Sequence, residues 1–345
     1  MRILVLGGTW FLGRALVENA LARGWEVTSF TRGRSGNPPE NAEHISGDRH
    51  DASSLRRLAQ AGPWDATIDT SAYEPGDVLA VIRALGERAG LFALMSTVSA
   101  YRAWPDRQVS ETSPLWPSRV DARETDPDIA ALPGPVQYGT LKAGCELAAR
   151  TAPGGALILR PGVILGPGEY TGRMLTLFER ARQGGRWLLP GPPDRHIQPV
   201  DVRDVASFTL DRVSDRSTGT YNVVASRLHH ATYGDLIAEC LRVTGGTSEP
   251  VWAAQMWLQH QGVEQWTEIP LWRVVPGAWE VSGEAAAAAG LVCRPLTETV
   301  ADTWADYQVR SPVPHPRQAE HGMTPDKEAR ILARWDELLA GTRRQ

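Results

Sequence analysis

The sequence contains very little lysine. Only two of its 36 Lys and Arg residues are lysines, Lys142 and Lys327, so arginine carries almost all of the positive charge. Cysteine is also rare, and the three cysteines, Cys145, Cys240 and Cys293, are odd in number and widely spaced. Such cysteines give neither a disulfide framework nor a metal-binding spacing. We therefore expect no metal site, and the pattern is typical of a reducing compartment such as the cytoplasm.

Long apolar runs and basic blocks are missing too. The first apolar run, at 3–6, is too short for a signal peptide, and no stretch approaches the ~18 apolar residues of a membrane span. The net charge is -4 and the pI is near 6.1. This balance argues against a nucleic-acid face, so we expect a small-molecule ligand and neither nucleic acid nor a membrane as partner.

What is present is an alternation of short apolar runs and amphipathic stretches, which predicts βαβ units and a parallel sheet. The expected strands lie near 2–6, 26–30, 42–46, 65–69, 91–96 and 156–160. The expected helices between them lie near 11–23, 53–61, 77–89 and 138–150. The segment 102–135, rich in Pro, Asp and Ser, is expected to be a long loop over the carboxyl edge of the sheet.

After residue 160 the pattern changes to glycine- and proline-rich segments between further helices. Helices are expected at 172–183, 202–213, 232–244, 283–289 and 325–340, and strands at 197–200 and 220–224 that return to the main sheet or its edge. The fold class is therefore α/β, a doubly wound parallel Rossmann sheet with a smaller C-terminal substrate-binding lobe. We assign residues 1–165, with a return segment near 196–225, to the dinucleotide-binding domain, and 166–195 and 226–345 to the lobe.

A glycine turn follows the first strand. It reads Gly7-Gly-Thr-Trp-Phe-Leu-Gly13 and leads into a helix, the context of a dinucleotide fingerprint. Free N–H groups at the helix start suit a pyrophosphate. Trp10 stands where a central glycine is expected, so its side chain should displace the pyrophosphate or fold over it. The expected cofactor contacts in this turn are Gly7, Thr9, Trp10, Phe11, Leu12 and Gly13.

The ends of the second and third strands indicate which dinucleotide is preferred. The second strand ends without a carboxylate for the ribose hydroxyls and continues into Arg32 and Arg34, which suit a 2′-phosphate. We therefore prefer NADP over NAD, with solvated arginines as the alternative. Asp48 could accept the adenine amino group or cap the next helix. Arg49 and Ser71 complete the expected cofactor contacts.

One tyrosine–lysine pair stands out. Tyr138 and Lys142 are four residues apart, so they share one face of the predicted helix. An ammonium beside a phenol favours the phenolate and lowers the tyrosine pKa. A tyrosine tuned in this way exchanges protons near neutral pH. The alternative is an ordinary exposed helix pair.

These motifs together resemble the extended short-chain dehydrogenase/reductase family, in its atypical epimerase-like group. The resemblance rests on the glycine turn, on Ser96-Thr-Val-Ser-Ala-Tyr101 and on Tyr138-Gly-Thr-Leu-Lys142. It is reinforced by the segments 159–167, 196–205 and 219–223. The family pattern implies that Thr97 bonds the substrate oxygen, Tyr138 exchanges its proton, and Lys142 holds the nicotinamide ribose. Relatives often dimerise through two helices, here 77–89 and 138–150.

The resemblance leaves three functions open. We expect an NADP-dependent oxidoreductase that interconverts a carbonyl and a hydroxyl group on a small molecule. The tryptophan-rich segment 252–279 favours an aromatic or natural-product substrate. The alternatives are an NAD-dependent sugar-nucleotide epimerase or dehydratase, and a non-catalytic nucleotide- or RNA-binding protein, because chloroplast stem-loop binding proteins share the glycine turn. Candidate substrate contacts are Ser99, Arg173, Arg195 and His196.

Overall fold

The computed structural model describes residues 1–34, 36–225, 231–310 and 313–342 of the chain. The chain divides into two compact units. Unit 1 comprises Met1–Ile164, Gln198–Arg227 and Pro276–Cys293, and unit 2 comprises Leu165–Ile197, Leu228–Val275 and Arg294–Gln345.

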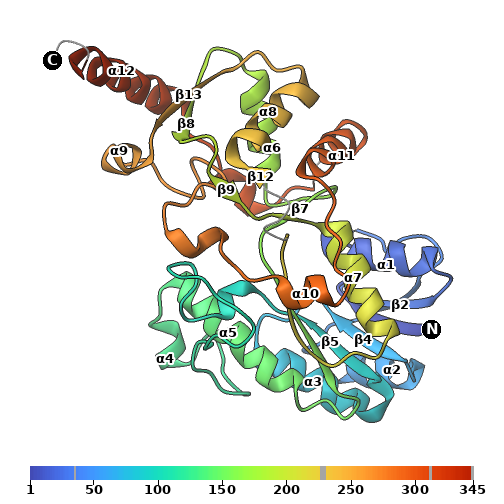
Figure 1. The fold of residues 1–345 in the computed structure, drawn as a ribbon. Coiled ribbons are helices and arrows are strands. Elements are labelled where there is room, and N and C mark those ends of the chain that lie inside the picture. The colour runs from blue at the N-terminus through green and yellow to red at the C-terminus, as the bar shows by residue number, and fades with distance from the viewer. Residues whose placement is uncertain (35, 226–230, 311–312, 343–345) are drawn as a thin grey trace. The chain divides into compact units, whose positions relative to one another are not determined.

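Unit 1 is built on a seven-stranded sheet in the order β11-β6-β5-β4-β1-β2-β3 (Figure 1). All of its neighbouring strands run parallel. The strands are β1 (Arg2–Leu6), β2 (Glu26–Thr31), β3 (Glu43–Ser46), β4 (Ala66–Asp69), β5 (Leu91–Met95), β6 (Ala156–Pro161) and β11 (Gly219–Val223). This order confirms the predicted doubly wound fold, in which ligands bind at the carboxyl ends of the strands.

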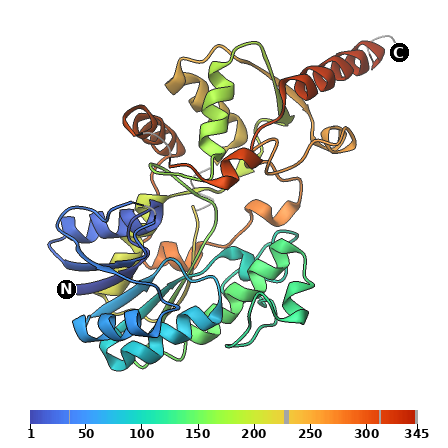
Figure 2. The same ribbon diagram turned by 180° about the vertical axis from the view of Figure 1, so that it is seen from behind.

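Helices cover both faces of this sheet. In β1, Ile3 and Val5 pack with α1 (Phe11–Ala22) and α7 (Val202–Ser214). The alternate residues Leu4 and Leu6 pack with the opposite layer. That layer consists of α2 (Ala52–Ala61), α3 (Pro75–Leu85) and α5 (Gly134–Ala149), which lie side by side in the view from behind (Figure 2). Strands buried on both faces need apolar residues at successive positions, which is why the sequence shows continuous apolar runs.

The rest of unit 1 is mostly irregular. The predicted loop at 102–135 contains one short helix, α4 (Pro127–Ala130), and α10 (Glu284–Ala288) lies near the end of the unit. The prediction of one strand at 197–200 that returns to the main sheet is wrong. Two separate two-residue strands, β9 (His196–Ile197) and β10 (Val200–Asp201), occur instead, and neither joins the main sheet. β10 pairs with β7 (Ile164–Leu165), so only the expected strand near 220–224 extends the sheet, as β11.

Unit 2 is mainly helical with two small ladders. β8 (Arg186–Gly191) pairs in parallel with β13 (Glu249–Ala254), and β9 pairs with β12 (Ala231–Thr232) in antiparallel orientation. Its helices are α6 (Arg173–Arg182), α8 (Tyr233–Thr244), α9 (Gln255–His260), α11 (Leu296–Val309) and α12 (Pro325–Thr342). A partly buried ion pair of 2.9 Å between Arg180 and Glu328 joins α6 to α12.

Side-chain hydroxyls cap the starts of two helices in unit 2. Thr232 and Asp235 form a capping box at α8, and α12 begins at Pro325 with Thr324 accepting from the amide of Lys327. Among the described residues, no helix combines the length and the apolar character that crossing a membrane requires.

Candidate functional site at the carboxyl edge of the sheet

The glycine turn between β1 and α1 is tightly packed. Gly7 has φ +94°, a conformation that side chains disfavour, and its amide donates to the carbonyl of Phe30 at 3.2 Å. A β-carbon at Gly13 would lie 1.9 Å from the Gly7 carbonyl oxygen. The turn therefore brings the start of α1 against the end of β1 as closely as the backbone allows.

The residues of this turn fit a dinucleotide phosphate. Trp10 is the N-cap of α1, but its side chain makes no capping hydrogen bond, and the first turn of α1 holds no acidic residue. The positive end of the helix therefore meets no negative side chain from the cap or first turn, which suits a phosphate. Trp10 has φ -137°, so this position requires no glycine.

The ends of β2 and β3 carry the residues expected near the adenosine. Arg32 and Arg34 are both exposed. A hydrogen bond from the His50 amide to the Asp48 carboxylate lowers the pKa of Asp48, and the charges of Arg32 and Arg34 contribute further. The alternative that Asp48 caps the following helix is wrong. Asp51 caps α2 by accepting from the amides of Ser53 and Ser54.

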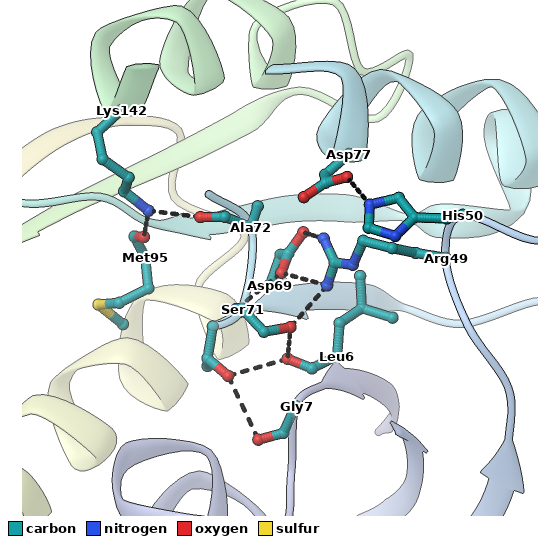
Figure 3. A network of polar contacts seen from close by, with 11 residues as sticks. Leu6, Gly7, Arg49, His50, Asp69, Ser71, Ala72, Asp77, Met95 and Lys142 are labelled. Atoms are coloured by element: carbon teal, nitrogen blue, oxygen red, sulfur yellow. Dashed lines mark hydrogen bonds and ion pairs between the residues drawn. The ribbon is translucent and has the colours of Figure 1, made fainter. Parts of the chain in front are cut away.

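A buried ion pair crosses the carboxyl edge between the ends of β3 and β4 (Figure 3). The guanidinium of Arg49 donates to both carboxylate oxygens of Asp69, at 2.9 and 3.0 Å, and to the hydroxyl of Ser71 at 2.6 Å. Ser71 in turn donates to the carbonyl of Leu6 at 3.3 Å, immediately before the glycine turn. Burial disfavours the Arg49 charge, but the Asp69 carboxylate outweighs it, and the net pKa of Arg49 is raised. The network therefore ties three strand ends together beside the turn.

Lys142 is anchored at the same edge (Figure 3). It lies on α5, is only 4% exposed, and donates to the carbonyl oxygens of Met95 at 2.7 Å and Ala72 at 3.0 Å. These carbonyls follow β4 and end β5, so the ammonium bridges two strand ends. Two of its three N–H donors are used in this way, which leaves one for a ligand.

Tyr138, one turn before Lys142, is 38% exposed. Its neighbour Gly139 packs directly on the carbonyl of Ser99, in the short helix that follows β5. Thr97 is the N-cap of that helix and accepts from the Ser99 amide at 3.1 Å. This local bond occupies one lone pair of the hydroxyl oxygen and leaves the hydroxyl proton available to a ligand.

Ser96 has a different environment. Its hydroxyl donates at 2.6 Å to the buried carboxylate of Glu146, which also receives two hydrogen bonds from Arg160 at 2.8 and 2.5 Å. Arg160 also donates to the phenol oxygen of Tyr101 at 2.7 Å, and that phenol donates to the side-chain oxygen of Asn222. Burial raises the pKa of Tyr101 despite the nearby Arg160. The side chains of Ser96 and Tyr101 are therefore hydrogen-bonded within a buried network, which the sequence did not predict.

Among the candidate substrate residues of unit 2, Arg195 and Arg173 contact different side chains. Arg195 donates to the side chain of Gln255, whereas Arg173 stacks on Trp266 at 5.0 Å from the ring centre. Arg273 stacks on the same ring at 4.6 Å, and burial lowers the pKa of all three arginines. His196 lies in β9, opposite Thr232. Most of the tryptophans of 252–279 are packed against other side chains, and Trp272 and Trp279 are buried.

Unit 1 thus collects a phenol, an anchored ammonium and a hydroxyl at one edge, beside a glycine turn suited to phosphate. This combination can exchange a proton with, and stabilise charge on, an oxygen atom held at the edge. Among the described residues, no group of three or more His, Cys, Asp or Glu side chains could hold a metal ion.

Comparison with known proteins agrees with this geometry. Residues 3–118 match the NAD dependent epimerase/dehydratase family. The 2-alkyl-3-oxoalkanoate reductase of Stenotrophomonas maltophilia is 32% identical over 228 residues, which are 60% of this chain and 63% of that protein. The chloroplast stem-loop binding protein of 41 kDa b from Arabidopsis thaliana is 23% identical over 263 residues, 72% of this chain and 64% of that protein. The chain thus spans somewhat less than two thirds of these two relatives.

The fold of most of the chain is shared with solved structures. UDP-glucose 4-epimerase of Thermus thermophilus, solved in complex with NAD, aligns with a TM-score of 0.63 at 18% identity. The alignment covers 89% of this chain and 99% of that chain. At this identity the likeness concerns the fold alone.

Proposed function

We propose that this chain is a member of the extended short-chain dehydrogenase/reductase family and an NADP-dependent oxidoreductase that interconverts a carbonyl and a hydroxyl group on a small molecule. The observation that carries the proposal is the anchoring of Lys142 on Met95 and Ala72, one helical turn from the half-exposed Tyr138. An arbitrary surface pair would not hold its lysine on the ends of two parallel strands. The named activity of the Stenotrophomonas relative, a reductase, supports the same class.

In this proposal the chain supplies position and proton chemistry. Bound NADPH would supply the hydride, or NADP⁺ accept it in the reverse direction. The turn 7–13 and Arg32 and Arg34 would hold the dinucleotide, with the third N–H of Lys142 directed to its ribose. The Tyr138 phenol would give a proton to the carbonyl oxygen while the Thr97 hydroxyl donates a hydrogen bond to it. Proton transfer of this kind is typically worth about 100- to 10,000-fold in rate.

The direct test is NADPH oxidation with a panel of small carbonyl compounds. Tyr138→Phe removes the proton and keeps the ring, so we expect kcat/KM to fall by about 100- to 10,000-fold with the Kd for NADPH unchanged. Thr97→Val should also lower kcat, because it removes the hydroxyl and keeps the branched shape. Full activity in Tyr138→Phe would refute the proposed role.

The NADP preference is tested separately. Arg32 and Arg34 are exposed, and their charges act on Asp48 at the same strand ends. Replacing both by Ala should weaken NADPH binding by on the order of 10-fold or more, because charge-assisted bonds to the 2′-phosphate are lost. NADH binding should not change. An equal loss for both nucleotides would contradict the preference.

A second candidate is a sugar-nucleotide epimerase or dehydratase that uses the same residues. It is favoured by the likeness of the fold to UDP-glucose 4-epimerase and by the two arginines stacked on Trp266 in unit 2. An epimerase regenerates its cofactor in each cycle, so it would retain bound NAD through purification. Release of the protein without nucleotide, together with net NADPH consumption, supports the reductase. RNA binding, suggested by the Arabidopsis relative, fits the net charge of -4 poorly.

A further inference from the structure

Exposed aromatic rings are concentrated in one place on this molecule. The chain has 13 Trp, 7 Tyr and 5 Phe residues, and all of them lie in the described part. Of these 25 rings, only those of Tyr73 and Tyr138 are exposed, at 61% and 38%. A single exposed aromatic residue needs no explanation, but these two are neighbours.

The two rings lie side by side at the carboxyl edge of the sheet. Their centres are 6.4 Å apart and their planes are tilted by 50°. Aromatic rings at such separations attract one another, and they also offer a face and an edge to a third ring. Tyr73 immediately follows Ala72, whose carbonyl accepts from Lys142. This contact and the ring pair together place Tyr73 beside Tyr138 and Lys142.

Although the Tyr73 ring is exposed, contacts on both sides of this residue hold its backbone in place. On one side, the carbonyl of Ala72 is bound by Lys142 of α5 at 3.0 Å. On the other side, Pro75 packs so closely on α5 that a β-carbon at Gly144 would lie 2.5 Å from its ring. Glu74 also accepts from the amide of Glu124 at 3.1 Å. Contacts on both sides therefore fix the Tyr73 backbone relative to Tyr138 on α5.

We propose that Tyr73 is a substrate-contacting residue that selects compounds with a planar, unsaturated ring attached to the reacting carbon. The inference rests on the proposed oxidoreductase function and extends it to a substrate class. With the carbonyl oxygen bonded to Tyr138 and Thr97, a ring on the carbonyl carbon would meet the exposed face or edge of Tyr73. A planar ring gains the specific aromatic contact, whereas a saturated ring of the same size gains apolar burial alone.

The test compares Tyr73→Leu, which removes the ring, with Tyr73→Phe, which keeps it. The substrates are benzaldehyde and cyclohexanecarbaldehyde, which match in size and differ in planarity, with NADPH as cofactor. We expect Tyr73→Leu to lower kcat/KM for benzaldehyde by on the order of 10-fold and to change cyclohexanecarbaldehyde little. Tyr73→Phe should resemble the wild type with both. Equal losses for the two aldehydes, or a change confined to the Kd for NADPH, would overturn the inference.

A binding measurement separates this inference from the proposed function. Saturation-transfer NMR with benzyl alcohol and cyclohexylmethanol needs no turnover. The wild type should show the stronger transfer to the aromatic alcohol, and Tyr73→Leu should lose that difference. If the protein oxidises NADPH with no compound of the carbonyl panel but keeps this difference, the reductase proposal fails and the ring selection stands. If the wild type shows no difference, the inference on Tyr73 fails, whatever the activity.

Discussion

Gly139 packs against the carbonyl oxygen of Ser99 so closely that a β-carbon at position 139 would lie 2.2 Å from that oxygen. Real β-carbon contacts are never this short, so only glycine lets α5 approach the end of β5 to this distance. The approach matters because Tyr138 precedes Gly139 and Thr97 caps the short helix that contains Ser99. One glycine thereby sets the spacing between the two hydroxyl groups of the proposed site.

We therefore expect Gly139→Ala to push α5 away from Ser99 and to lower kcat by at least 10-fold, since misplacement by about 1 Å costs on the order of 100-fold. The Kd for NADPH should change little, because the glycine turn lies elsewhere. Gly76→Ala is the matched control, since a β-carbon there meets nothing within 4 Å. It should leave turnover intact and the melting temperature equal or slightly higher. Equal kcat in the two variants would contradict the spacing argument.

A substitution in the glycine turn should weaken NADPH binding, whereas Gly139→Ala should lower kcat. In Gly13→Ala the new methyl would collide with the Gly7 carbonyl oxygen, so the start of α1 must move away from β1. We expect NADPH binding to weaken by more than 10-fold in calorimetric titration, because the N–H groups of the helix leave the phosphate position. Stability should fall as well. A Gly13→Ala protein that folds and binds NADPH normally would show that the turn does not hold the phosphates.

The Arg49–Asp69 pair should matter for both stability and nucleotide affinity. Arg49→Met leaves the Asp69 carboxylate buried and unpaired, so we expect the free energy of unfolding to fall by about 3–5 kcal/mol. Arg49→Lys keeps the charge but loses the two-pronged geometry and should restore only part of this loss. Urea denaturation measures the change.

The double variant Arg49→Met, Asp69→Leu separates the effect of this pair on stability from its effect on nucleotide affinity. It should regain stability, yet bind NADPH more weakly than the wild type, because Ser71 loses its donor beside the turn.

The buried thiol of Cys145 gives a prediction about pH. Burial raises the pKa of Cys145 from 9.0 to about 12, although Lys142 opposes the shift. At pH 8 the folded protein should react with iodoacetamide at this residue far more slowly than the denatured protein, because the thiolate is the reactive form. The folded pKa is the higher one, so the stabilisation is complete below pH 9 and is lost as the pH rises toward 12. Cys145→Ala should flatten that loss in denaturation at alkaline pH, and rapid labelling of the native protein would refute the assignment.

The sequence predicts the strands of the main sheet to within about one residue. Its central strands, such as β1 and β5, appear as continuous apolar runs because they are buried on both faces. It does not predict β8 and β13, which pair across some sixty positions in segments rich in proline and glycine. The Glu146–Arg160 contact was missed for a related reason. Nothing in the local pattern shows that a glutamate on α5 and an arginine on β6 face each other in the interior.

The candidate site shows the same limit. The types and spacing of Tyr138 and Lys142 are visible in the sequence, and so is the glycine turn. The groups that hold them are not, because Lys142 is bound by main-chain carbonyls, which every residue carries. Asp69 offered one signal, as an acidic residue that ends a buried apolar strand, but its partner Arg49 lies twenty positions earlier and follows a different strand.

The engagement of Ser96 by Glu146 has a consequence for the energetics of turnover. The strand end next to Thr97 is fastened on one side by that carboxylate and on the other by the ammonium on Met95. The dipoles of a strand end fixed in this way need not reorient when negative charge appears on a nearby oxygen. Water molecules in the same place would have to reorient. The cost of solvent rearrangement is thus met during folding, before any substrate arrives.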